Sequence, residues 1–181
     1  MRKVLIDTCV LYPTVAREIL LAVAKEGLFE PLWSPRILEE WARAARKLGP
    51  TGEVQARAEI AVVTAAWPRS GITPRDGDLA RLWLPDENDI HVLAAAIAGS
   101  ADLLLTWNMR DFPRDTLRDE GLERSDPDSF LMELWLSEPQ PVTDAVNRIY
   151  DHSQQMDNIP KTRRALLKKA RLPRLARALE G

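Results

Sequence analysis

LPDENDIHVLAAAIAGSADLLLTWNMRDF, residues Leu84–Phe112, is the stretch that decides the fold of this chain. It passes from an acidic turn into an alanine-rich segment with helical periodicity, then through Gly-Ser into the apolar run Leu103–Leu105 and a second polar turn. A short, continuous apolar run is typical of a strand buried on both faces of a parallel sheet. The polar residues at the ends of these two elements are Asp86, Glu87, Asp89, Asn108 and Asp111. The stretch therefore predicts an α/β fold with acidic side chains gathered at one edge of the sheet.

A second apolar run, near the N-terminus, ends in the same way. Lys3–Ile6 predicts a buried strand, and Asp7 and Thr8 follow it directly. Open α/β sheets bind ligands at the carboxyl ends of their strands, so Asp7 is a candidate site residue. Its alternative role is that of a turn or helix N-cap residue. We expect the adjacent Cys9 to be a small buried apolar residue rather than a nucleophile, because nothing near it in the sequence would lower the pKa of its thiol.

The composition fits one globular domain with a small appendage. The chain has 181 residues, of which 45% are hydrophobic. Its sequence holds no apolar run near the ~18 residues of a membrane span. The first residues turn polar at Asp7, which is too early for a signal peptide. A single cysteine allows no intrachain disulfide and favours a reducing cytoplasm.

The segment between residues 13 and 67 predicts helices on either side of a second strand. Val15, Ile19 and Val23 recur at helical spacing, and the brief apolar segment 28–33 predicts a strand that is broken or edged by Pro31. Ser34 and a following proline then suit the N-cap and first turn of a helix. The apolar spacing over residues 53–67 predicts a further amphipathic helix.

Several of the acidic residues also suit plain structural roles. Glu39 and Glu40 stand early in the helix that Ser34 starts, where the helix dipole favours negative charge. Asp86 suits the N-cap of the helix that follows it, with Asp89 at the third helical position in a variant of the capping box. From the residues alone these alternatives remain open.

Carboxylates that gather in one crevice need a counter-charge. Two of them ~6 Å apart repel by roughly 3 kcal/mol at an effective dielectric constant of ~20, and some members of a larger group would take up protons. A hard divalent cation removes this cost, and Mg²⁺ and Mn²⁺ prefer oxygen ligands. Zinc would need histidine or cysteine, and His91, His152 and Cys9 are too scattered for such a site. The residues therefore favour a Mg²⁺ or Mn²⁺ centre.

Three motifs occur along the chain in a recognisable order: VLIDT (residues 4–8), SPRILEE (34–40), and DIHVLAAA (89–96) followed by LLTWNMRDF (104–112). Together they resemble the PIN-domain ribonucleases, and especially the VapC-type toxins of VapBC toxin–antitoxin pairs, in a longer subfamily with a C-terminal helical extension. The resemblance implies a PIN-like three-layer α/β/α fold with a central parallel sheet of four to five strands. It also implies a nuclease domain over residues 1–130 and a C-terminal helical extension with a basic tail over residues 131–181.

The resemblance assigns a role to each acidic residue. The family's four catalytic acids match Asp7, Glu40, Asp89 and Asp111. We expect Asp7 and Asp89 to bind the metal, directly or through water, and the other two to complete its shell or to accept a proton. The last position departs from the pattern of many relatives, which have aspartate where this chain has Asn108. Supporting roles are expected for Asn108, Asp86, Thr8 and Thr106.

The function that the resemblance implies is Mg²⁺- or Mn²⁺-dependent hydrolysis of RNA phosphodiesters by a cytoplasmic toxin. The expected protein partners are a small VapB-like antitoxin and a second copy of the chain in a homodimer. One alternative is a catalytically weakened PIN-like module that binds RNA or serves as a scaffold, which Asn108 leaves open. A less favoured alternative is a haloacid-dehalogenase-like phosphatase, since that family has a second aspartate where this chain has Cys9.

Charge is unevenly distributed along the chain. The net charge is −2, but residues 161–181 carry eight Lys/Arg and one acidic residue, against 17 basic and 26 acidic residues elsewhere. Such a basic tail suits contact with RNA phosphates, with an acidic surface of this chain or of its antitoxin, or with solvent alone. The tail residues that we expect to contact RNA are Arg163, Arg164, Lys168, Lys169 and Arg171.

Overall fold

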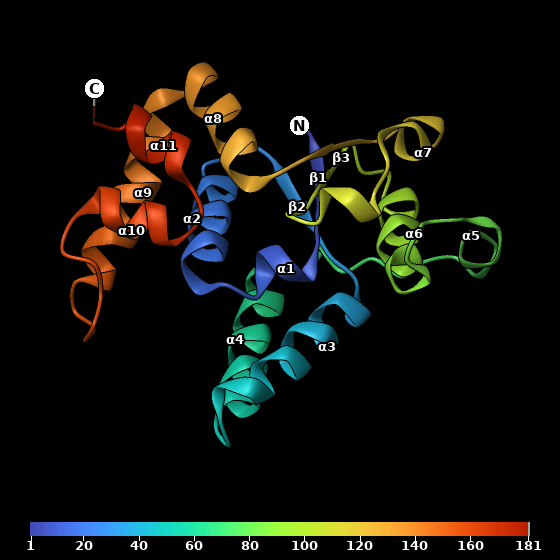
Figure 1. Cartoon of the computed structure of the whole chain (residues 1–181), viewed down its shortest axis with the longest axis horizontal. Helices are drawn as coiled ribbons and strands as arrows, with labels where there is room; N and C mark the ends of the chain where they lie inside the picture. Colours follow the sequence, from blue (N-terminus) through green and yellow to red (C-terminus); the bar gives the residue numbers. More distant parts are fainter. Residues whose placement is uncertain (181) are drawn as a thin grey trace.

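A parallel sheet with helices on both sides forms the centre of the molecule in the computed structural model, which describes residues 1–180 (Figure 1). The strands are β1 (Lys3–Ile6), β2 (Glu30–Leu32), β3 (Leu103–Leu105) and β4 (Glu123–Ser125). Their order across the sheet is β2-β1-β3-β4, and every neighbouring pair is parallel. The α/β class and the PIN-like sheet are confirmed, with four strands rather than five.

The two central strands are the most apolar segments of the sheet. In β1 the side chains from Val4 to Ile6 are fully buried, and β3 is buried throughout. The register pairs Leu5 with Leu32 on one side and with Leu104 on the other. Pro31 has no backbone N–H to donate, and it lies in the edge strand β2, where that donor is not needed on the outer side.

Helices cover both faces of the sheet. In Figure 1, α2 lies on the left of the sheet and α6 on the right. The helices of the first two thirds of the chain are α1 (Thr8–Leu11), α2 (Thr14–Lys25), α3 (Pro35–Ala44), α4 (Gly52–Ala66), α5 (Asp76–Arg81), α6 (Ile90–Ala98) and α7 (Arg114–Asp119). Three short 3-10 turns join them: η1 (Ala45–Leu48), η2 (Glu87–Asp89) and η3 (Met109–Asp111). The alanines on the inner face of α6 are fully buried, so this helix lies close to the sheet.

The start of α6 differs from the predicted capping box. The turn η2 precedes the helix, and the carboxylate of Asp86 caps that turn by accepting a hydrogen bond from the backbone N–H of Asn88 at 2.9 Å. Asp89 stands immediately before α6, and its side chain makes no cap hydrogen bond. Asp86 is therefore a cap, as expected, although of η2 rather than of α6, and the capping-box alternative for Asp89 does not hold. The carboxylate of Asp89 is therefore not used in capping the helix.

Four C-terminal helices complete the molecule: α8 (Pro127–Ser137), α9 (Pro139–Ser153), α10 (Arg163–Lys169) and α11 (Pro173–Ala178). Helix α9 packs against α2 through buried residues such as Val142 and Val146. The carboxylate of Asp128 in α8 accepts hydrogen bonds from the backbone N–H groups of Arg174 and Leu175 at the start of α11. The division of the chain at residue 130 stays a prediction. That position lies inside α8, and the helices beyond it share their core with the sheet domain.

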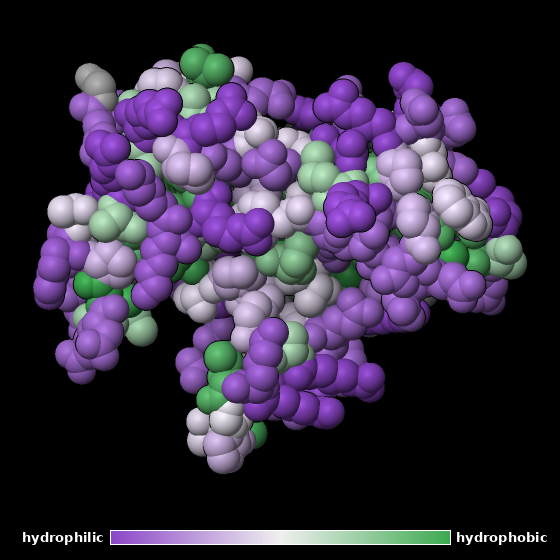
Figure 2. Space-filling model, in the orientation of Figure 1, coloured by the Kyte–Doolittle hydropathy of each residue, from purple (hydrophilic) through white to green (hydrophobic). Residues whose placement is uncertain are grey.

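Helices α3 and α4 project from the body as an arm, at the bottom of Figure 1. An open groove lined by α2, α4 and α9 separates this arm from the C-terminal helices, and Figure 2 shows it as a notch in a largely hydrophilic surface. None of the described helices combines the length and the apolar character that a bilayer crossing requires.

Candidate metal centre

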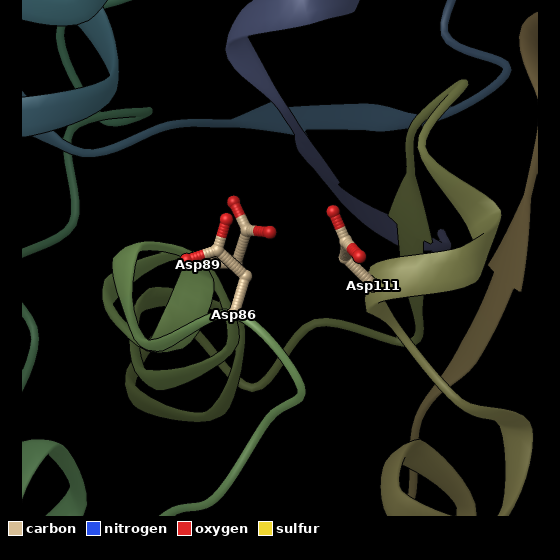
Figure 3. A group of neighbouring side chains, drawn as sticks. All are labelled: Asp86, Asp89 and Asp111. Atoms are coloured by element: carbon tan, nitrogen blue, oxygen red, sulfur yellow. The ribbon is translucent and has the colours of Figure 1, made fainter.

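Three carboxylates meet at the carboxyl edge of the sheet. Asp86 and Asp89 come from the turn before α6, and Asp111 comes from η3, which follows β3. One oxygen from each lies within 4.8 Å of the others. Figure 3 shows Asp111 facing the two other side chains across a gap. Of the predicted site residues, the structure thus gathers Asp89 and Asp111, together with Asp86, which the sequence had assigned only a supporting role.

The surroundings of these carboxylates supply hydrogen bonds and some positive charge from His91 near Asp89, but no ion pair in the described part of the chain. The side-chain amide of Asn108 donates to Asp111 at 2.7 Å, so this asparagine orients the carboxylate that follows it. The Oδ2 atom of Asp89 is buried and has no hydrogen-bond partner among the described residues. No ion pair within residues 1–180 involves any of the three acids. Buried polar atoms rarely stay without a partner, so the gap has the character of a cation site.

The electrostatics of Asp89 show the combined effect of burial and of the neighbouring negative charges, which the charge of His91 offsets only in part. Burial raises the pKa of its carboxyl to about 6, with further contributions from the negative charges of Asp7, Asp86 and Asp111. A nearby cation would act in the opposite direction, because it favours the charged form of a carboxylate. The raised pKa therefore reflects first the burial of this carboxyl and second its repulsion by the neighbouring acids.

Asp7 lies near Asp89, directly after β1. One of its oxygens accepts hydrogen bonds from the hydroxyl of Thr106 at 2.8 Å, and the other from the backbone N–H of Thr8 at 2.7 Å. Burial raises the pKa of Asp7 and outweighs these hydrogen bonds. Asp7 is close enough to Asp89 to affect its pKa. Its predicted role as a direct metal ligand stays a prediction, since its oxygens are not within the group of three.

Glu40 lies outside the group of Asp86, Asp89 and Asp111 and belongs to a neighbouring network of polar side chains. Its carboxylate accepts a hydrogen bond from the hydroxyl of Thr8 at 3.2 Å, pairs with Nε2 of His91 at 2.9 Å, and pairs with Arg36 at 3.3 Å. Burial acts to raise the pKa of Glu40, but the hydrogen bond and charge of His91, with smaller contributions from Thr8 and Arg36, leave it lowered. Thr8 connects the two acids: its hydroxyl donates to Glu40, and its backbone N–H donates to Asp7.

His91 is the residue of this region that sequence reasoning missed. Its side chain is 4% exposed, and its Nδ1 atom has no hydrogen-bond partner among residues 1–180. The sequence did contain a signal, because a histidine two positions after Asp89 interrupts an otherwise apolar helix face. Without the fold, nothing indicated that Glu40, from a different helix, would lie opposite this histidine.

The choice of Glu40 over its neighbour agrees with where the two side chains lie. Glu39 is on the outer side of α3, where it forms ion pairs with Arg43 and Arg57. These two arginines, chiefly through hydrogen bonds, lower the pKa of Glu39 to about 2. Glu39 therefore forms surface ion pairs on the α3–α4 arm, whereas Glu40 contacts His91 and Thr8 beside the site.

The five tail residues that were predicted to contact RNA divide into three groups. Arg163 donates hydrogen bonds to Asn147 and to the carbonyl oxygen of Leu179, and Arg164 pairs with Glu180 at 2.5 Å, so both serve contacts within the tail. Lys168 and Lys169 are exposed at the end of α10. Arg171 is different, because its guanidinium carbon lies 4.5 Å from the centroid of the Trp107 ring, in the loop after β3.

Cys9 is half-buried rather than fully buried, and its thiol is neutral, as the sequence predicted. Burial, together with the charge of Asp7, raises the pKa of Cys9 to about 11. At pH 8 we expect iodoacetamide to modify this thiol about a hundredfold more slowly in the native protein than in urea, since only the thiolate reacts. Mass spectrometry of timed samples measures both rates, and the label reports on one site because the chain has a single cysteine. Equal rates in the two states would contradict the assignment.

With this geometry in view, comparison with known proteins identifies the family. The family model described as PIN domain matches residues 3–110. The chain belongs to the PIN-domain family. The matched segment of the PIN domain holds Asp7, Glu40 and Asp89, and it ends one residue before Asp111.

A curated relative gives a shorter match to this PIN-domain protein. The chain is 40% identical over 45 residues to VapC50 of Mycobacterium tuberculosis, a protein whose name describes it as a ribonuclease. The match spans 25% of this chain and 27% of the relative. No solved structure matches significantly.

The donor set of this PIN domain fits a hard divalent cation. All three gathered ligands are carboxylates, which Mg²⁺ and Mn²⁺ prefer. A cation at this position would give the buried Oδ2 atom of Asp89 a partner and would stabilise the charged form of this carboxyl, whose pKa is raised. The nearest histidine, His91, directs its Nε2 at Glu40 rather than into the group, so a zinc site would lack the nitrogen and sulfur ligands that zinc takes.

Proposed function

We propose that the protein is a Mg²⁺- or Mn²⁺-dependent endoribonuclease that hydrolyses RNA phosphodiesters as the toxin of a toxin–antitoxin pair. The observation that carries the proposal is the group formed by Asp86, Asp89 and Asp111 at the carboxyl edge of a PIN-domain sheet. The relative named as a ribonuclease supports the substrate class. The phosphatase alternative is not favoured, because the chain belongs to another family.

In this proposal the three gathered acids hold the cation. Asp89 contributes its unpartnered Oδ2, and Asp111 is kept in position by Asn108. When bound, Mg²⁺ or Mn²⁺ supplies charge stabilisation for the phosphodiester oxygens and lowers the pKa of water. A carboxylate of the site accepts the proton of the attacking water, a task for which a pKa near the working pH is suited. Because the cation would hold Asp89 in its charged form, Glu40 or Asp111 is the better candidate for this proton.

Asp7 and Glu40 support this group from positions beside it. Asp7 adds a negative charge near Asp89, and Thr106 and Thr8 fix its orientation. Glu40 is held by His91 and Thr8, so its charge is fixed at the side of the site. In this arrangement Thr8 and Thr106 act as positioning residues, because each donates its hydroxyl to one of the two acids.

The test combines cleavage with thermal unfolding. We expect the purified protein to cut single-stranded RNA when Mg²⁺ or Mn²⁺ is added, and to stop when EDTA removes it. The cation should also raise the melting temperature in the absence of RNA, because it binds only the folded state; a hundredfold excess over Kd corresponds to about 2.7 kcal/mol. Calcium-free buffer with added KCl of equal ionic strength is the control. A protein that binds RNA, does not cut it and does not respond to either cation would instead be the weakened scaffold module.

Partners and location belong to the same proposal. The relative's name supports a VapB-like antitoxin as the protein partner, and co-purification from cells that express both neighbouring genes would test it. The homodimer stays a prediction, which light scattering of the purified chain would decide. The proposal of a cytoplasmic location rests on the single cysteine, which cannot form a disulfide bond within the chain.

A further inference from the structure

The loop that follows β3 carries a tryptophan between two residues of the site. Thr106 donates its hydroxyl to Asp7, and Asn108 donates its amide to Asp111. Trp107 stands between them, half-buried, with its backbone N–H donated to the sulfur of Cys9 at 3.4 Å. The position of the Trp107 ring is thus tied to the same loop that positions the acids.

The C-terminal extension places an arginine against this ring. The guanidinium carbon of Arg171 is 4.5 Å from the ring centroid, which is within the range of a cation–π contact. Arg171 is exposed, and it forms no ion pair or side-chain hydrogen bond with any other described residue. A guanidinium held over a ring by a cation–π contact still has N–H groups that can donate to a phosphate.

The backbone at Arg171 adds an independent observation. Arg171 has φ 63°, in the left-handed region, at the end of α10. Its own N–H bonds to the carbonyl oxygen of Lys168, and the next N–H, of Leu172, bonds to that of Leu167. Glycine is the usual residue at this point of such a helix end, and a non-glycine residue there costs on the order of 1 kcal/mol. The turn itself does not need an arginine side chain, so its presence calls for another reason.

The charge of the site supplies that reason. In the proposed function the cation offsets the charge of the three carboxylates themselves, and a positive side chain beside them would hold the phosphates of the strand next to the cleaved bond. Other arginines of the tail, Arg163 and Arg164, are engaged within the extension. Arg171 is the tail residue that reaches the loop between the two halves of the site.

We propose that Arg171, stacked on Trp107, binds a phosphate of the RNA strand beside the acidic group, so that the extension contributes a substrate-binding residue to the site of the PIN domain. This rests on the proposed function for the identity of the substrate. The contact is electrostatic and independent of base sequence. It predicts a role in holding the substrate rather than in the chemical step.

The variant Arg171→Gly tests this contact without a folding penalty, because glycine suits the left-handed backbone at this position. Arg177→Ala is the matched control, since it removes one positive charge from the exposed surface of the same extension. Binding of fluorescein-labelled single-stranded RNA is measured by anisotropy in an Asp89→Asn background, so that the strand stays intact. Cleavage kinetics are measured in the wild-type background, and melting temperature is followed for every variant.

We expect Arg171→Gly to weaken RNA binding about tenfold and to reduce the slope of log K against log salt by about 0.7, the value of one phosphate contact on a single strand. KM should rise while kcat stays near its original value, and the melting temperature should be unchanged or higher. Arg171→Lys should recover part of the binding, since it restores the charge without the planar fork. Arg177→Ala should bind within twofold of the parent.

Unchanged binding and KM in Arg171→Gly, or an equal loss in Arg177→Ala, would overturn the assignment. A failure of the proposed function gives a different result: the wild-type chain would bind RNA without cutting it, while Arg171→Gly would still bind more weakly. A lowered kcat at unchanged KM would also contradict a substrate-holding role.

Discussion

Asp89→Asn is expected to abolish RNA cleavage and, in the absence of metal, to stabilise the protein. The loss of activity should be about a thousandfold, since a cation site supplies several kcal/mol of transition-state stabilisation. The gain in stability follows from the charge that the substitution removes. Burial and the neighbouring acids raise the pKa of Asp89 to about 6, so in the folded protein its charged form is opposed.

The pH dependence of this difference follows from the sign of the shift. The folded-state pKa of Asp89, about 6, is above the 3.8 of an unperturbed aspartate. Below about pH 4 the Asp89 carboxyl of the wild type is neutral, like the asparagine of the variant, so the two proteins are equally stable. As the pH rises through 6 the wild-type carboxyl becomes charged and the folded protein loses stability. In EDTA, the melting temperatures of wild type and Asp89→Asn should agree at low pH and diverge between pH 4 and pH 7, with the variant higher.

Glu87→Gln is the control for Asp89→Asn, because it neutralises an exposed acid of the same turn that lies outside the three-carboxylate group. It should keep full activity and show no added stability at neutral pH. An Asp89→Asn protein that cuts RNA at the wild-type rate would remove Asp89 from the proposed site. An equal melting temperature at every pH would contradict the electrostatic description of the metal-free protein.

The second large effect is expected at Arg17, whose side chain is almost fully buried at the base of the α3–α4 arm. It donates to the carbonyl oxygens of Leu11 and Tyr12 at 2.6 and 3.1 Å, and it pairs with Glu59 of α4 at 2.7 Å. Its guanidinium also lies over the Trp41 ring of α3, 4.3 Å from the centroid. One side chain therefore connects α1, α2, α3 and α4.

Arg17→Leu should lower the free energy of unfolding by about 3 kcal/mol, because it leaves two carbonyl oxygens and part of a carboxylate without their donor. Urea denaturation measures the change. Arg118→Leu makes the same substitution on the surface, where the ion pair with Asp115 is exposed, and it should stay within about 0.5 kcal/mol of wild type. A loss below 1 kcal/mol in Arg17→Leu would show that the carbonyl groups find other partners.

Residues that follow an apolar strand were predictable from the sequence, and partners across the fold were not. Asp7 and Asp111 could be placed at the carboxyl edge because the runs before them are continuous and apolar. The place of Asp86 beside Asp89 and Asp111 was not predictable, since a cap and a candidate metal ligand use the same side chain and sequence spacing does not separate them. His91 and Arg17 resemble isolated polar residues on helices, and only the packing of α3 against its neighbours gives them Glu40, Glu59 and Trp41 as partners.

The contact between Arg171 and Trp107 is another partnership between distant parts of the chain that the sequence did not predict. The sequence indicated a basic tail, but its residues were equal candidates for RNA contact. The structure separates them, because α10 ends in a left-handed turn that directs a single arginine toward the loop after β3. Such a contact depends on the docking of α11 by Asp128, and no local pattern predicts it.

The parallel pairing of β1 with β3 also has a consequence for synthesis on the ribosome. Asp7 and Thr106 are hydrogen-bonded across a sequence separation of 99 residues, and β4, which flanks β3, comes still later in the chain. While the first hundred residues are being translated, β1 has only β2 as a partner, and the acids that follow β1 and β3 cannot meet. The proposed metal centre is divided in this way between early and late parts of the chain, so it cannot assemble in the nascent chain before β3 has been translated.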